Sequence, residues 1–124
     1  MSANISIFRG VSYDIQYNHE DSDGTPVSLE DCTVYLTVKS VESDSSVDDT
    51  TAKIKKTLTS ADHDNAVGGI TTFHLRDNDT QIDVGDYFYD VVVENETTKD
   101  SEPPSLYGTF TVVAKVTNRN VGNE

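Results

Sequence analysis

The segment YFYDVVVE, residues 87–94, is the most strongly strand-like part of the chain. Its apolar residues alternate, so that one side carries Tyr87, Tyr89, Val91 and Val93 and the other carries Phe88 and Val92. A period of two is the period of a pleated strand, whose successive side chains point to opposite faces. Apolar residues on both faces are typical of a strand with neighbours on both sides, so we predict a central strand here.

Shorter alternating runs on both sides of this segment predict further strands. They occupy residues 4–8, 11–17, 33–39, 52–58, 70–75 and 106–116. Gly10, between the first two runs, is expected to take a bend where the chain changes partner or sheet. The run at 52–58 carries Lys56 on its apolar side and is predicted to be an edge strand, since lysine guards against sheet-to-sheet aggregation. The polar stretch from Glu42 to Thr51 is predicted to be a mobile surface loop.

Length and composition favour one sheet domain. The 124 residues suffice for a single core, and Val, Ile and Thr supply 36 residues against 11 for Leu, Ala and Met. Branching at Cβ restricts side chains in helices but packs well on a pleated surface. About seven short strands with no long helix describe an all-β, antiparallel β-sandwich over residues 1–117, with a flexible tail at 118–124. No stretch approaches the roughly 20 apolar residues of a membrane helix or resembles a signal peptide, so we expect no membrane partner.

The charge balance restricts the partners further. Acidic residues outnumber basic ones 22 to 9, for a formal net charge of −13 and a pI near 4.3. Such a surface repels phosphate backbones, so no direct contact with nucleic acid is expected. The same charge destabilises a compact state through self-repulsion unless salt screens it, which leads us to expect a protein that is stabilised by salt. Acidity that serves only solubility is the simpler interpretation.

No catalytic or cofactor-binding motif is apparent. His19, His63 and His74 are scattered, and the one cysteine, Cys32, is predicted to be a buried, inert thiol without a disulfide partner. The chain has no glycine-rich phosphate loop, no GxSxG, no HExxH and no CxxC. We therefore predict a protein that is not an enzyme and that takes no cofactor.

One acidic stretch partly matches a calcium loop. Between His19 and Glu30, the residues Asp21, Asp23 and Glu30 fall at positions 3, 5 and 12 of the EF-hand pattern. Position 1 is His19, however, and imidazole is a poor ligand for a hard cation. The three carboxylates are weak metal candidates, and a solvated Asp-Gly turn is the expected structure. A cation-dependent module that recognises a host surface or a glycan through these acidic loops remains the alternative function.

Some apolar residues suggest protein contacts instead of core packing. Tyr35 and Phe88 are predicted to form an outward pair that anchors a partner, because aromatic residues are enriched in interfaces. The first run, with Ile5, Ile7 and Phe8, is predicted to add to the sheet of a neighbouring molecule, as is the C-terminal segment 117–124. These residues are our docking candidates.

The order of several short motifs resembles one known family. The motifs are Arg9-Gly10, DGTPVSLEDCTVYLTVK at 23–39, GGITTFHL at 68–75, DNDTQIDVGDYFYDVVVE at 77–94 and YGTFTVVAKVT at 107–117. Together they resemble the immunoglobulin-like domain that opens phage baseplate upper proteins and recurs as a stand-alone structural protein of tailed-phage virions. The resemblance implies an immunoglobulin-like sandwich, a location in the virion, and other virion structural proteins as partners that bind multiple copies.

The matching residues have understandable packing roles. Gly24 permits a hairpin turn, Gly85 a bend into the strand that follows, and Gly108 a close pass of the last strand over its neighbour. Leu29 is expected to plug one end of the sandwich. The hydroxyl groups of Tyr87 and Tyr89 are expected to reach the backbone at the rim, as in a tyrosine corner.

Overall fold

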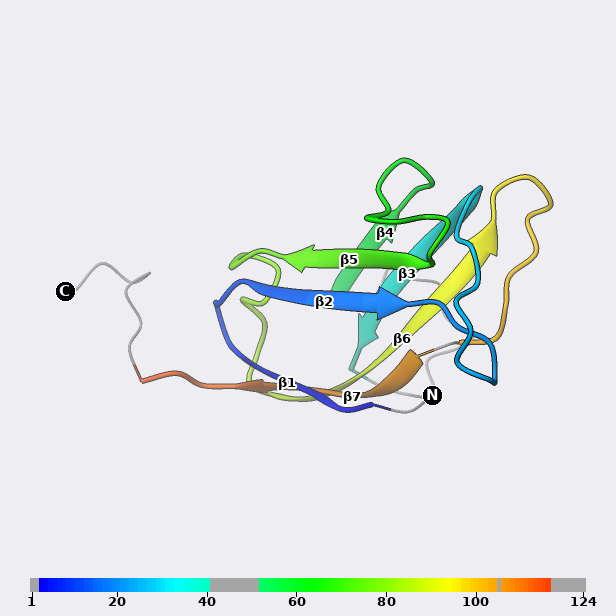
Figure 1. Ribbon diagram of the computed structural model, residues 1–124. Helices are drawn as coiled ribbons and strands as arrows, with labels where there is room; N and C mark the ends of the chain where they lie inside the picture. Colours follow the sequence, from blue (N-terminus) through cyan, green and yellow to red (C-terminus); the bar gives the residue numbers. More distant parts are fainter. Residues whose placement is uncertain (1–2, 41–51, 105, 117–124) are drawn as a thin grey trace.

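The computed structural model describes residues 3–40, 52–104 and 106–116, and seven strands in this part of the chain form two facing sheets (Figure 1). The strands are β1 (Ile5–Phe8), β2 (Tyr13–Asn18), β3 (Cys32–Lys39), β4 (Ile54–Leu58), β5 (Ile70–Leu75), β6 (Gly85–Asn95) and β7 (Leu106–Val113). One sheet has the order β1-β7-β6-β3-β4, and the other pairs β2 with β5. The predicted loop at 42–51 and tail at 118–124 lie outside the described residues.

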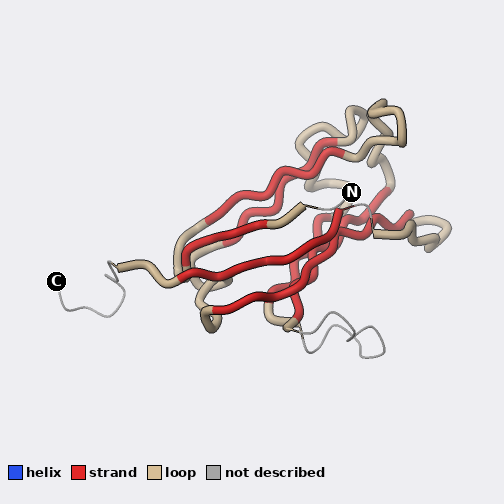
Figure 2. The backbone as a smooth tube through the Cα atoms, turned by 90° about the horizontal axis from the view of Figure 1, so that it is seen from below, coloured by secondary structure: helices blue, strands red, loops and turns tan. Residues whose placement is uncertain are grey.

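Figure 2 shows that the described residues form strands joined by loops and turns, with no helix among them. Among the described residues there is no helix with the length and apolar character needed to cross a lipid bilayer. The five-stranded sheet twists, so that β1 and β7 run nearly along β2, whereas β3 and β4 cross behind it (Figure 1).

The central position predicted for residues 87–94 is confirmed. β6 lies between β7 and β3, with Tyr89 opposite Gly108 on one side and opposite Val38 on the other. Its inward side chains, from Tyr87 to Val93 at every second residue, are all buried. The side chains between them are half-buried or exposed, because they point away from the second sheet.

The prediction of an antiparallel sandwich needs one correction at the first strand. β1 pairs with β7 in parallel, from Ile5 opposite Phe110 to Phe8 opposite Val113. A parallel pair requires a long connection, and here all of the intervening chain supplies it. Gly10, with a φ of 75°, then takes the bend that carries the chain from the five-stranded sheet to β2, as expected.

β4 is an edge strand, as its lysines predict. Lys56 lies opposite Leu36 on the inward-facing side, and its ammonium group forms an ion pair of 2.8 Å with Asp79 in the loop between β5 and β6. Burial acts to raise the pKa of Asp79, but hydrogen bonds from Lys56 and from the Arg76 backbone N–H outweigh it and lower that pKa. The lysine on the apolar side therefore ties the edge of the large sheet to a loop that follows the small one.

The core fills the space between the two sheets. Phe73 and Leu75 of β5 face Leu36 of β3 and Phe110 of β7, and all four side chains are at most 1% exposed. Leu29 is fully buried in the same cluster, and its backbone N–H donates to the carbonyl of Ala66 in a neighbouring loop. This position agrees with the predicted plug at one end of the sandwich.

Two tyrosines of β6 bind the sheet to flanking backbone. The Tyr87 hydroxyl donates to the carbonyl of Asp83, four residues upstream, at 2.5 Å, which is the arrangement of a tyrosine corner. The Tyr89 hydroxyl donates to the carbonyl of Ala3, also at 2.5 Å, and so holds the segment that leads into β1. Burial raises the pKa of both hydroxyl groups.

Gly108 makes the close approach of the first segment possible. A Cβ atom at this position would collide with the backbone oxygen of Ala3 and would meet the Asn4 side chain. The Ala3 backbone N–H donates to the carbonyl of Tyr107 at the same place. A residue larger than glycine therefore does not fit at position 108. Gly24 and Gly85 differ, because a Cβ atom added at either position would have no atom within 4 Å.

Candidate docking face

The side chains of the five-stranded sheet that point away from the core form a broad surface. Its large apolar members come from four neighbouring strands, namely Phe8 on β1, Tyr107 and Val113 on β7, Phe88 and Val92 on β6, and Tyr35 on β3. We call these six residues the outer face. Every second side chain of a strand points to this side. The same alternation that puts the core residues on one side of the sheet therefore puts these six residues on the other.

The outer face is most exposed along the edge of the sheet that β1 and β7 form, with Phe8 and Val113 at one end of this edge and Tyr107 at the other. Phe8 is 55% exposed and lies opposite Val113, which is 38% exposed, and Tyr107 on the same strand is 48% exposed. Phe88 and Tyr35 are half-buried on the inner strands of the sheet. Exposed aromatic side chains on the open side of a sheet offer a large apolar area that a protein partner can bury at little cost in side-chain entropy.

Hydrogen bonds fix the polar groups between these apolar residues. The Tyr35 hydroxyl donates to Glu94 Oε1 at 3.3 Å, and burial followed by the charge of Glu94 raises the pKa of that hydroxyl. Nearer the exposed edge, Thr111 Oγ1 donates to Asp86 Oδ1 at 2.9 Å. Tyr35 also lies directly opposite Val92, so its ring packs on the sheet instead of moving freely. The arrangement suits recognition of a protein surface.

Three of the five docking candidates lie on this face. Phe8, Tyr35 and Phe88 all point outward from the same sheet. The sequence reasoning did not select Tyr107 and Val113, although the alternation of residues 106–113 around the buried Phe110 and Val112 already carried the signal.

The side chains of Ile5 and Ile7 point toward the core, not toward a partner. Ile7 is buried at 5% exposure and Ile5 packs against the core, because β1 turns this side toward the second sheet. The backbone of β1 is also already paired with β7 along one edge. Its other edge remains for a neighbouring chain, so strand addition by residues 4–8 stays a prediction, although the side chains of Ile5 and Ile7 are not available for docking.

The weak metal candidates are not assembled into a cation site. Asp21 Oδ1 accepts the backbone N–H groups of Asp23 and Thr25, and Glu30 Oε1 accepts the hydroxyl of Ser28. In residues 3–40, 52–104 and 106–116, no group of three or more His, Cys, Asp or Glu side chains could hold a metal ion. The stretch is an Asp-Gly turn closed by a bridge between Glu20 and Pro26, the structure expected of it.

Two histidines have structural partners that the sequence does not reveal. His19 is 4% exposed, with the Tyr17 hydroxyl 2.7 Å from Nδ1 and Glu102 Oε2 3.3 Å from Nε2. His63 bridges Thr71 Oγ1 and the Cys32 carbonyl. Both histidines lie in loops that the sequence predicts to be polar connections. Glu102 is far from His19 in the sequence, as Cys32 is from His63, so these contacts arise only in the folded chain.

The thiol of Cys32 is buried. Burial, followed by the charges of Glu102 and Asp31, raises the pKa of this thiol above its usual value. It is therefore protonated at neutral pH, and a protonated thiol is a poor nucleophile.

The loops that surround these histidines concentrate negative charge at one end of the sandwich (Figure 1). Loops 19–31, 59–69 and 96–104 carry ten carboxylates and one lysine, Lys99; the carboxylates are Glu20, Asp21, Asp23, Glu30, Asp31, Asp62, Asp64, Glu96, Asp100 and Glu102. We call these three loops the acidic end. Hydrogen bonds from the backbone and side chain of Thr59 lower the pKa of Asp62, and those from Thr33 and Ser60 lower the pKa of Glu96. The repulsion therefore persists to mildly acidic pH.

Raising NaCl is expected to stabilise the domain, because screening weakens repulsion within the acidic end. A gain of about 1 kcal/mol corresponds to a rise of about 4 °C in Tm for a domain of this size. Thermal unfolding followed by circular dichroism across NaCl concentrations measures it. The variant E20Q/D23N/D100N is the control and should show a smaller rise. A flat or falling curve for the wild type would contradict the prediction.

Comparison with known proteins identifies no family. No family model matches the chain, and no curated protein matches its sequence. Among solved structures, the chain is similar to the extracellular domain of the voltage-gated sodium channel beta4 subunit, with 16% identity over 93% of each chain and a TM-score of 0.38. That protein forms parallel homodimers, which explain its role in cell-cell adhesion. With seven strands in two facing sheets and a tyrosine corner, the chain studied here is an all-β, immunoglobulin-like domain.

Proposed function

We propose that this chain is a non-enzymatic structural protein of a tailed virus particle, which docks in multiple copies onto other virion proteins through its outer face. The observation that carries the docking proposal is the group of exposed apolar side chains on the outer face of one sheet, with Phe8, Tyr107 and Val113 along its β1–β7 edge. The order of sequence motifs supports the assignment to a virion. The baseplate, tail, neck and capsid are all compatible positions.

The chemistry of the face supports a protein partner over a small molecule. Small-molecule sites are concave and bury most of their ligand, whereas the outer face is the open side of a sheet. Aromatic residues at protein interfaces contribute most when a partner covers them completely. In a virion, each copy of the chain would have a neighbouring virion protein that covers its outer face.

Incorporation into particles tests the proposal. Purified particles are expected to contain the wild-type chain in many copies, as measured by quantitative mass spectrometry and by antibody labelling in electron micrographs. The variant F8S/Y107S removes the two most exposed aromatic side chains of the outer face and should reduce incorporation at least tenfold while the domain stays folded.

The matched control is V67S, which removes an apolar side chain that is 68% exposed in a loop of the acidic end. This variant should enter particles as the wild type does. Absence of the chain from purified particles would refute the virion assignment. Normal incorporation of F8S/Y107S would refute the outer face as the docking surface.

A further inference from the structure

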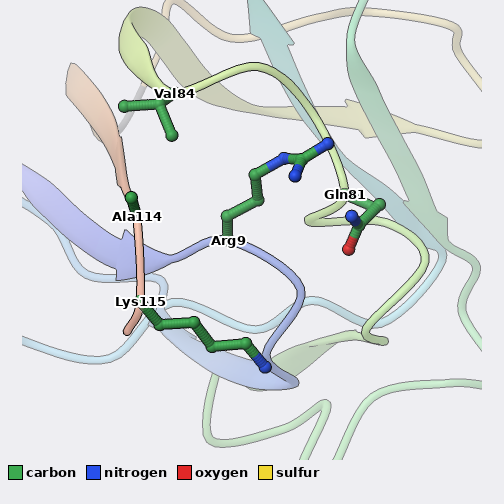
Figure 3. A pocket seen from close by; sticks show the side chains of 5 residues that line it. All are labelled: Arg9, Gln81, Val84, Ala114 and Lys115. Atoms are coloured by element: carbon green, nitrogen blue, oxygen red, sulfur yellow. The ribbon is translucent and has the colours of Figure 1, made fainter. Parts of the chain in front are cut away.

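A small pocket lies at the end of the sandwich opposite the acidic end. It has a volume of about 100 Å³ and is lined by Arg9, Gln81, Val84, Ala114 and Lys115 (Figure 3). Its walls come from the bend after β1, the loop before β6 and the segment after β7. Two of the nine basic residues of a strongly acidic chain therefore meet at one pocket.

The position of Arg9 in the pocket is fixed by the fold. Its backbone N–H donates to the carbonyl of Val113, and its side-chain Nε donates to the carbonyl of Ile82 at 2.8 Å. Within the described residues, neither Arg9 nor Lys115 forms an ion pair with a carboxylate, and the terminal guanidinium nitrogens of Arg9 have no acceptor. The pocket thus offers a preorganised guanidinium fork, while the Lys115 side chain runs in a different direction and holds its ammonium group apart from the guanidinium (Figure 3).

This donor set selects a carboxylate as ligand. A guanidinium group binds a carboxylate through two parallel hydrogen bonds, and the charge of Lys115 elsewhere in the pocket lining adds a longer-range attraction. Val84, which is 55% exposed, and Ala114 add an apolar wall that can cover the methylene group of an aspartate. The volume accommodates one short acidic side chain.

The chain itself carries a suitable ligand at its other end. Asp23 is exposed at the tip of the Asp-Gly turn, and the Asp21 carboxylate holds that turn rigid by accepting two backbone N–H groups. Glu20 beside it is exposed as well. A turn that is already rigid loses little conformational entropy when it docks. The Asp-Gly turn at residues 20–26 does not assemble a cation site, but it presents an exposed carboxylate that a positively charged pocket can bind.

We propose that the Asp23 turn of one copy docks into the Arg9 pocket of a second copy. Because the two surfaces differ, the contact is head-to-tail, and repeating it produces open chains or rings instead of a closed two-fold dimer. The inference goes beyond the proposed function, since it concerns the pure protein and needs no virion partner.

Ionic strength should affect this association in a characteristic way. At about 0.01 M salt the Debye length is about 30 Å, so the net charges of −13 on the two copies repel each other and suppress docking. At about 0.15 M it is about 8 Å, which screens the distant charges but leaves the close contact in the pocket. At about 1 M it is about 3 Å, and the contact itself weakens. Self-association should therefore be strongest at intermediate salt.

Charge reversal in sedimentation equilibrium tests the pairing directly. The pocket variant R9E/K115E and the turn variant E20K/D23K should each remain at the monomer mass of 13.6 kDa under conditions where the wild type associates. An equimolar mixture should associate again, because the intact turn of the pocket variant fits the intact pocket of the turn variant. The association constant of each single variant with itself should fall at least tenfold.

The control variant K53E/K55E makes the same change in net charge on exposed lysines of the β4 edge and should keep the pocket-dependent association. Circular dichroism verifies folding, and K115E alone serves if loss of the Arg9 hydrogen bond unfolds the double variant. Self-association of the turn variant would overturn the head-to-tail contact in favour of a pocket-to-pocket dimer. A wild type that stays monomeric at millimolar concentration in every salt would overturn the proposal altogether.

Discussion

Replacing Phe110 with alanine is expected to lower the free energy of unfolding by about 3–5 kcal/mol. The ring is fully buried on β7, where it lies opposite Ile5 and Tyr87 and meets Tyr89 edge-on with the ring centroids 6.2 Å apart. Its removal deletes apolar burial and leaves a cavity between the sheets, and β strands relax little into such a space. A loss of this size is a large part of the roughly 5–15 kcal/mol that stabilises an ordinary domain.

Phe8 provides the matched control, because it is the same residue type on the neighbouring strand but is 55% exposed on the outer face. Phe8→Ala should change stability by no more than about 0.5 kcal/mol. Urea unfolding followed by circular dichroism measures both variants. Equal losses for the two variants would show that the two faces of the large sheet have been assigned wrongly.

Replacing Gly108 with alanine is expected to release the first strand. The added Cβ collides with the backbone oxygen of Ala3, which cannot move without breaking its hydrogen bond from the Tyr89 hydroxyl. Detaching β1 would lose the burial of Ile7, worth about 1.5–3 kcal/mol, and that hydrogen bond, worth about 1 kcal/mol. We therefore expect a loss of about 3 kcal/mol in the free energy of unfolding.

Hydrogen exchange of the backbone amides distinguishes this local release from general destabilisation. Amides of β1 should exchange much faster in Gly108→Ala, while those of β3 and β6 keep most of their protection. Gly24→Ala is the control, since its φ of 81° is strained for alanine but no atom lies within 4 Å of the added Cβ. If both variants lose about 1 kcal/mol and β1 stays protected, backbone strain and not the collision with Ala3 is the cause.

Much of the fold could be predicted from the sequence, because alternation is a local signal. Residues 87–94 alternate in a way that only a strand can satisfy, and their apolar second face correctly indicated neighbours on both sides. The pairing of β1 with β7 could not be predicted in the same way. Alternation says which face of a strand is buried but not in which direction its neighbour runs, so the parallel pairing of Ile5–Phe8 with the last strand could not be foreseen.

The candidate site could be predicted in part for the same reason. Tyr35 and Phe88 were assigned outward because they interrupt buried alternating residues, and this local reasoning holds for Phe8 as well. The environment of His19 could not be predicted, since Glu102 reaches it from a loop more than eighty residues away. The Arg9 pocket depends likewise on three segments that meet only in the folded chain.

The parallel pairing of β1 and β7 has a mechanical consequence. β1 enters the sheet at one end of the domain and β7 leaves it at the other, so tension between these two strands acts along their length. The hydrogen bonds that join the strands lie across that direction and are strained together in shear, whereas a terminal hairpin would unzip one bond at a time. We therefore expect the domain to resist stretching more strongly than one whose terminal strands form a hairpin.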